Sequence, residues 1–146
     1  MSVPTYKRSA SSAQFMYDLY TFNIRIGEIC MNSPKKYRMN YADKIIQDSL
    51  DALKYAKLAN DIYINKSTTE RDFMRRKEYL KMAKSLIEHV ATVCEIFLEQ
   101  QRKYGSCDNQ KILKNEEFVG MKCSEISDML SALIKSDRQR QLRYSK

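Results

Sequence analysis

The chain has 146 residues, a formal net charge of +8 and an isoelectric point near 9.3. This length favours one domain over residues 1–146 with a single core. With only three glycines and two prolines the chain has little material for tight turns, so few and long elements are expected. No window reaches the roughly 20 apolar residues of a membrane span, and the N-terminus lacks the apolar run of a signal peptide. We therefore expect a cytoplasmic protein that does not cross a membrane.

The first half of the chain predicts two helices joined by a corner. Between about residues 10 and 31, apolar residues recur at spacings of three and four, as on one helical face: Phe15, Leu19, Phe22, Ile26 and Ile29. The stretch SPKKYRMNYADKI (33–45) then predicts a corner, because Pro34 disfavours helical backbone before it and Asn40 is suited to cap the next helix. That helix is expected over about Tyr41 to Asn65, with Tyr63 on its core face.

The second half predicts two longer helices. One is expected to begin at the capping-box pattern Ser67-Thr68-Thr69-Glu70 and to stop at Gly105, with Phe73, Leu80, Ile87 and Cys94 seven residues apart. The other spans about Lys111 to Asp137, with a similar ladder of Ile112, Val119, Ile126 and Leu133. We expect residues 1–9 and 138–146 to form flexible tails.

These four segments predict an all-α fold, namely an antiparallel up-down four-helix bundle with long helices and a basic C-terminal tail. Each seven-residue apolar ladder needs partner helices on which to bury itself, and antiparallel neighbours suit the short connections. The sequence has no strand pattern and no internal repeat.

Basic residues gather at one end of this expected bundle, where the first and third helices begin and the second and fourth end. The residues assigned to that end include sixteen basic and five acidic ones, against ten and thirteen at the other end. Basic residues at a helix start oppose the helix macrodipole, so propensity does not explain them. With Tyr6, Tyr79 and Tyr144 nearby to stack, they predict salt-dependent binding to nucleic-acid phosphates, the alternative being a solvated basic surface. The predicted nucleic-acid-binding residues are Arg71, Arg75, Arg76, Lys77, Lys81, Lys84, Arg138, Arg140 and Arg143.

Apolar residues also occur on helix faces that the core does not use. Two ordered stripes, one on each of the first two helices, favour a homo-oligomer, although the residues do not give the subunit number. The predicted interface residues are Tyr17, Tyr20, Ile24, Tyr55, Leu58 and Ile62.

Enzyme motifs are missing from the sequence. The only histidine, His89, is predicted to lie on the surface without a carboxylate partner, and the three glycines do not form a phosphate-binding loop. The four cysteines are scattered without a Cys-x-x-Cys pair, which predicts reduced thiols and neither a disulfide nor a zinc site. We expect a non-enzymatic protein with no catalytic residue, metal or cofactor.

Several segments between about residues 13 and 140 resemble a known family. They are Ser33-Pro34-Lys35 before the second helix and Glu125-Ile126, Met129-Leu130, Leu133-Ile134-Lys135 and Ser136-Asp137-Arg138 in the fourth. In this order they resemble four-helix-bundle proteins encoded in intervening sequences of bacterial large-subunit ribosomal RNA genes. The same superfamily includes the accessory variability determinants of diversity-generating retroelements. The resemblance implies a ring-like homopentamer. For the retroelement branch it also implies a basic surface that binds template RNA or an RNA–DNA hybrid, and a reverse transcriptase as partner.

Two functions follow as hypotheses. The first is a basic nucleic-acid-binding accessory protein of the retroelement type. The second is an oligomeric interaction scaffold of the intervening-sequence type, in which the apolar stripes mediate assembly and the basic residues recruit an acidic protein. Phosphate contacts lose affinity steeply with salt, and a pure scaffold would not bind RNA, so RNA binding at two salt concentrations distinguishes them.

Overall fold

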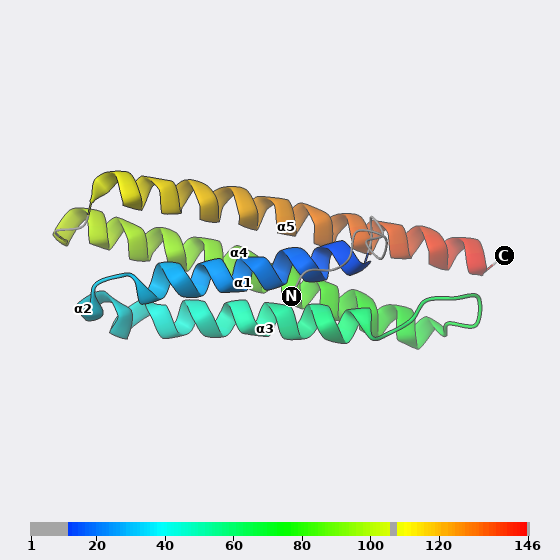
Figure 1. The fold of residues 1–146 in the computed structure, drawn as a ribbon. Coiled ribbons are helices and arrows are strands. Elements are labelled where there is room, and N and C mark those ends of the chain that lie inside the picture. The colour runs from blue at the N-terminus through cyan, green and yellow to red at the C-terminus, as the bar shows by residue number, and fades with distance from the viewer. Residues whose placement is uncertain (1–11, 106–107, 146) are drawn as a thin grey trace.

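The computed structural model describes residues 12–105 and 108–145, which Figure 1 shows as a set of long helices. Four long helices account for most of them: α1 (Ser12–Met31), α3 (Asp43–Asn60), α4 (Glu70–Tyr104) and α5 (Asn109–Tyr144). The short helix α2 (Lys35–Tyr37) and the π-helical turn η2 (Arg38–Ala42) connect α1 to α3. No strand occurs in these described ranges, so the all-α prediction is confirmed.

The long helices pack side by side around one core. α4 contacts both α3 and α5, and α1 contacts the same two helices. In Figure 1 the chain crosses the molecule in alternate directions, so that the beginnings of α1 and α4 and the ends of α3 and α5 lie toward one end. At this end the loop 61–69 and the last turns of α5 project beyond the first turn of α1. We call the loop 61–69, the start of α4 (70–84) and the end of α5 (134–145) the basic end.

The core follows the predicted apolar faces. Side chains that the described structure buries completely or nearly so come from all four long helices, and they include Phe15, Leu19, Phe22, Ile45, Leu80, Ile87, Ile126 and Leu130. The face of α3 is lined mainly by small residues, since Ala52, Ala56 and Ala59 are all 0% exposed. Small side chains let the backbone of α3 approach its neighbours closely.

The corner after α1 forms where predicted but ends differently. The Ser33 hydroxyl donates to the carbonyl oxygen of Ile29 over 2.8 Å, and Pro34 adopts extended backbone with φ −55° and ψ 139°. The chain then returns at once to helical geometry. The prediction that Asn40 caps the second helix is wrong, because Asn40 lies inside η2 and the residue before α3 is Ala42, which provides no side-chain cap.

The boundary between α3 and α4 also differs from the prediction. α3 ends at Asn60 instead of Asn65, so Tyr63 lies in the loop, 82% exposed, and not on the core face. The cap of α4 is Thr69, whose hydroxyl accepts from the Asp72 N–H over 3.1 Å, and not Ser67. Gly105 follows the last residue of α4, as predicted.

Residues 138–144, which the sequence assigned to a flexible tail, continue α5 as helix. Asp137 is buried, and Arg140, Gln141 and Tyr144 are half-buried. These positions are three or four residues apart, so one face of the charged segment stays against the rest of the bundle. Residues 1–9 and 146 lie outside the described part of the chain.

The described cysteines are free thiols inside the core. Cys30, Cys94 and Cys123 are all buried, and Cys107 lies outside the described residues. Burial raises the pKa of Cys30 to about 11 and that of Cys123 to about 12. It also raises the pKa of Cys94, to which the neighbouring Cys30 and Cys123 contribute further. Within the described ranges, no helix is long and apolar enough to cross a membrane.

The buried thiols predict that the protein loses stability in alkali. Cys123 has a folded-state pKa of about 12 against an ordinary value of 9.0, so its neutral form stabilises the fold fully below about pH 9. As the pH rises from there toward the folded-state pKa, the unfolded chain loses the proton first and this stabilisation disappears. The free energy of unfolding should therefore fall less steeply with pH in Cys123→Ala, by about 1.4 kcal/mol per pH unit. Urea unfolding at several pH values measures both slopes, and equal slopes would contradict the expectation.

Candidate nucleic-acid interface

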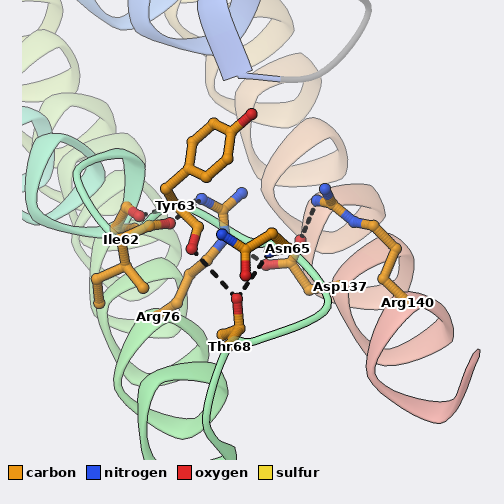
Figure 2. A network of polar contacts seen from close by, with 8 residues as sticks. Ile62, Tyr63, Asn65, Thr68, Arg76, Asp137 and Arg140 are labelled. Atoms are coloured by element: carbon orange, nitrogen blue, oxygen red, sulfur yellow. Dashed lines mark hydrogen bonds and ion pairs between the residues drawn. The ribbon is translucent and has the colours of Figure 1, made fainter. Parts of the chain in front are cut away.

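A buried ion pair joins α4 to α5 at the basic end (Figure 2). Arg76 Nε lies 2.6 Å from Asp137 Oδ2, and the two side chains are only 5% and 7% exposed. Arg76 Nη1 also donates to the carbonyl oxygens of Ala59, over 3.1 Å, and Ile62, over 3.2 Å. One guanidinium therefore connects the end of α3, the following loop, α4 and α5.

The prediction that Arg76 contacts nucleic acid is wrong, because its side chain is buried and its Nε and Nη1 donate within the fold. A signal for this burial was present in the sequence. Arg76 lies three residues after Phe73 and four before Leu80, so it belongs to the core stripe of its helix. What the stripe could not show was the partner, Asp137, which is 61 residues away.

Arg140 is also part of this network. Its Nη2 donates to Asp137 Oδ1 over 2.7 Å, and its side chain is 28% exposed. Asp137 thus accepts from two arginines, one on each of two helices. Arg140 keeps some access to solvent, whereas Arg76 has almost none.

The other predicted cations lie on the surface of the basic end. Two of them form surface ion pairs within α4: Arg75 with Asp72 over 3.5 Å, and Lys84 with Glu88 over 3.3 Å. Such pairs are weak, so they leave the cations available to a ligand. Five more are exposed and form no ion pair with another described residue: Arg71, Lys77, Lys81, Arg138 and Arg143.

The ion pair determines which cations lie together. Lys77 directly follows Arg76 in α4, and Arg138 directly follows Asp137 in α5. Successive side chains of an α-helix are rotated by about 100° around the helix axis. Because α4 and α5 run in opposite directions, the two steps bring both side chains to the same side of the α4–α5 seam. Lys84 and Lys81 follow on that side of α4, seven and four residues after Lys77. We call Lys77, Lys81, Lys84 and Arg138 the basic seam.

Arg71 and Arg75 lie on a different side of α4. Both are on the helical stripe of Tyr79, whose ring stacks on Tyr55 of α3 with a centroid distance of 6.2 Å. The nine predicted cations therefore do not form one surface. Tyr79 is half-buried in this stack and is not free to stack on a base, Tyr144 is half-buried, and Tyr6 lies outside the described residues.

The predicted oligomer interface is divided as well. Tyr20 and Ile24 are 37% and 48% exposed on α1, and Tyr17 is half-buried. By contrast, Tyr55 and Leu58 of α3 and Ile62 of the following loop are half-buried, and the Tyr55–Tyr79 stack shows that this stripe turns toward α4. The two stripes therefore do not merge into one exposed face, because part of the second packs within the same chain.

A polar contact that the sequence did not reveal joins α3 to α4. His89 Nδ1 lies 2.7 Å from Oδ2 of Asp48, whose side chain is 4% exposed, and Lys44 Nζ lies 3.1 Å from the other carboxylate oxygen. The prediction that His89 lacks a carboxylate partner is therefore wrong, although its side chain is half exposed as expected. The described residues contain no group of three potential metal ligands. The contact supports a structural role, since it connects two helices.

No protein-family model matches the chain, and comparisons with the curated proteins and with the solved structures found no match. Evidence for function therefore comes from the chain's own residues.

The buried ion pair predicts a large difference between neighbouring arginines. Arg76→Ala should lower the free energy of unfolding by about 3–5 kcal/mol, because Asp137 would stay buried without its main partner. Arg76→Met combined with Asp137→Leu should recover most of this loss, since apolar groups of similar volume replace both charges. The control is Arg75→Ala on the surface, which should cost less than about 1 kcal/mol. Denaturant unfolding followed by circular dichroism measures all three, and equal losses for Arg75→Ala and Arg76→Ala would contradict the expectation.

Proposed function

We propose that the protein is a non-enzymatic RNA-binding accessory protein whose main phosphate-contacting surface is the basic seam. The observation that supports this most is that Lys77 and Arg138, each next in sequence to a member of the ion pair, are exposed and have no acidic partner among the described residues. Like charges brought together repel each other and reduce the stability of the compact state. Phosphates of a bound strand would relieve this repulsion.

The geometry of the basic seam suits a phosphate backbone. Lys77 and Lys84 are seven residues apart on α4, which corresponds to a rise of about 10 Å. A row of this length can neutralise several phosphates, and lysine side chains contact phosphates as point charges without reading base edges. We therefore expect affinity that falls steeply with salt and varies little with base sequence.

The sequence resemblance supplies the biological setting of the proposal. It supports template RNA, or an RNA–DNA hybrid, of a diversity-generating retroelement as the ligand and a reverse transcriptase as the protein partner in the cytoplasm. A neighbouring reverse-transcriptase gene with a template repeat would support this setting. An interrupted ribosomal RNA gene would instead support the intervening-sequence branch.

Charge reversal in the basic seam should weaken RNA binding. For Lys77→Glu combined with Arg138→Glu we expect at least a tenfold loss at low salt. The slope of log affinity against log salt should also shrink by about 1.4, since each phosphate contact to a single strand contributes about 0.7. Fluorescence anisotropy of labelled RNA at several salt concentrations measures both quantities.

The matched control changes the net charge equally at the other end of α5. Lys111 and Lys114 are both exposed, so Lys111→Glu combined with Lys114→Glu should leave RNA affinity close to that of the unmodified protein. Far-UV circular dichroism checks that both double variants stay helical. Equal weakening by both variants would mean that only total charge matters and would contradict a localised site.

A second candidate is the homo-oligomeric scaffold, a pentamer by sequence resemblance. The specific observation in its favour is that Tyr20 and Ile24 of α1 remain exposed, together with Leu50 of α3 at 47%. Exposed apolar side chains on two helices that pack together are favourable to cover with a second copy of the chain. On this proposal the assembly contact runs along α1 and not along the Tyr55 stripe.

Ile24→Glu should therefore reduce the oligomer to smaller species, because it would bury an unpaired carboxylate in the contact. Light scattering after size-exclusion chromatography gives the mass of each variant. The control is Leu113→Glu on α5, since Leu113 is 50% exposed and outside the proposed contact. An unchanged mass for Ile24→Glu would exclude α1 as the contact. An oligomer that does not bind RNA would favour the scaffold function.

A further inference from the structure

The loop between α3 and α4 presents an aromatic side chain to solvent at the basic end. Tyr63 is 82% exposed, the highest value among the large apolar and aromatic side chains that the structure describes as exposed. Figure 2 shows its ring pointing away from the polar network of the loop. Exposing an aromatic ring to this extent forgoes the favourable burial that such side chains normally contribute.

The backbone that carries this ring is held in place from two sides. Arg76 donates to the carbonyl oxygen of the preceding residue, Ile62, over 3.2 Å, and the Thr68 hydroxyl donates to the Tyr63 carbonyl oxygen over 3.3 Å. Thr68 also accepts from the Asn65 N–H over 2.7 Å, which closes the loop (Figure 2). The ring therefore projects from an ordered support, which lowers the entropy that a ligand must remove on binding.

Two positively charged side chains belong to the same loop as Tyr63 or to the polar network that holds this loop. Lys66 is exposed three residues further along the same loop. The contacts from the Ile62 carbonyl to Arg76, from Arg76 to Asp137 and from Asp137 to Arg140 bring the partly exposed Arg140 guanidinium to the same network. Proteins combine exposed aromatic rings with positive side chains on one surface to hold unpaired nucleotides.

Resting on the RNA-binding function proposed above, we propose that the protein selects single-stranded over duplex RNA, with Tyr63 stacking on one unpaired base. Lys66 and Arg140 contact the phosphates next to that base. In a duplex each internal base is covered on both faces by its neighbours, so Tyr63 has no face on which to stack. A single strand exposes its base faces and also lets its phosphates reach the basic seam.

The first test compares a labelled RNA of about 12 nucleotides with the same strand annealed to its complement. Tyr63→Ala should weaken single-strand binding roughly 5- to 150-fold, which corresponds to the loss of one base–aromatic stack. Tyr63→Phe should keep the affinity, because the ring remains. The salt slope should not change in either variant, since no phosphate contact is lost. The control is Tyr104→Ala at the opposite end of α4, where Tyr104 is 66% exposed, and its affinity should match the unmodified protein.

The second test uses the absence of tryptophan from the chain. Tyr63→Trp places a single tryptophan in the loop, and its fluorescence should be quenched by the single strand but not by the duplex. Tyr104→Trp should respond to neither. If the unmodified protein binds no RNA, both the proposed function and this inference fail. If RNA binds through the basic seam but Tyr63→Ala binds single strands normally, or weakens single strand and duplex equally, only the stacking inference fails.

Discussion

The buried contact between Arg76 and Asp137 is the interaction on which the basic end of the molecule depends. Removing two charges from water costs several kcal/mol for each, so a buried pair needs further hydrogen bonds around it. Arg76 donates to the carbonyl oxygens of Ala59 and Ile62, and Asp137 accepts from Arg140. The Ala59 carbonyl at the end of α3, which also accepts from the Ile62 N–H, is thus bound by a side chain of another helix. These contacts join the end of α3, the following loop and the last turns of α5 to α4.

Polar contacts of the same kind occur along the whole length of the bundle. A ladder of similar apolar residues tolerates a shift of one helix past another, because each step presents a comparable surface. A hydrogen bond between two specific residues does not tolerate such a shift, so it defines the register. Contacts of this kind between helices include Asn23 with Ser49, Asp48 with His89, Glu88 with Ser127, Arg102 with Glu116 and, from the segments after α1, Ser33 with Gln101 and Tyr41 with Gln100.

The same ion pair shapes the surface that we propose for RNA binding. It keeps Arg76 buried, away from solvent. It also helps to fix the rotation of α4 relative to α5, and this rotation directs Lys77 and Arg138 to one side of the seam. It also supports the loop that exposes Tyr63. The proposed phosphate-contacting row and the proposed aromatic platform therefore share one structural support. A single buried charge pair can organise a binding surface in this way without touching the ligand itself.

The sequence by itself determined the helices and most of the core, because helical periodicity is a local property and residues such as Leu80, Ile87 and Ile126 lie on it without interruption. It also placed the excess of positive charge near one end. Only the tertiary structure decided which individual polar residues are buried and which partners they have. Arg76 is buried and Arg75 exposed, and Asp48 meets His89, because each outcome depends on a partner in another helix. Tyr63 likewise lies in the loop and not on the predicted core face, because α3 ends at Asn60.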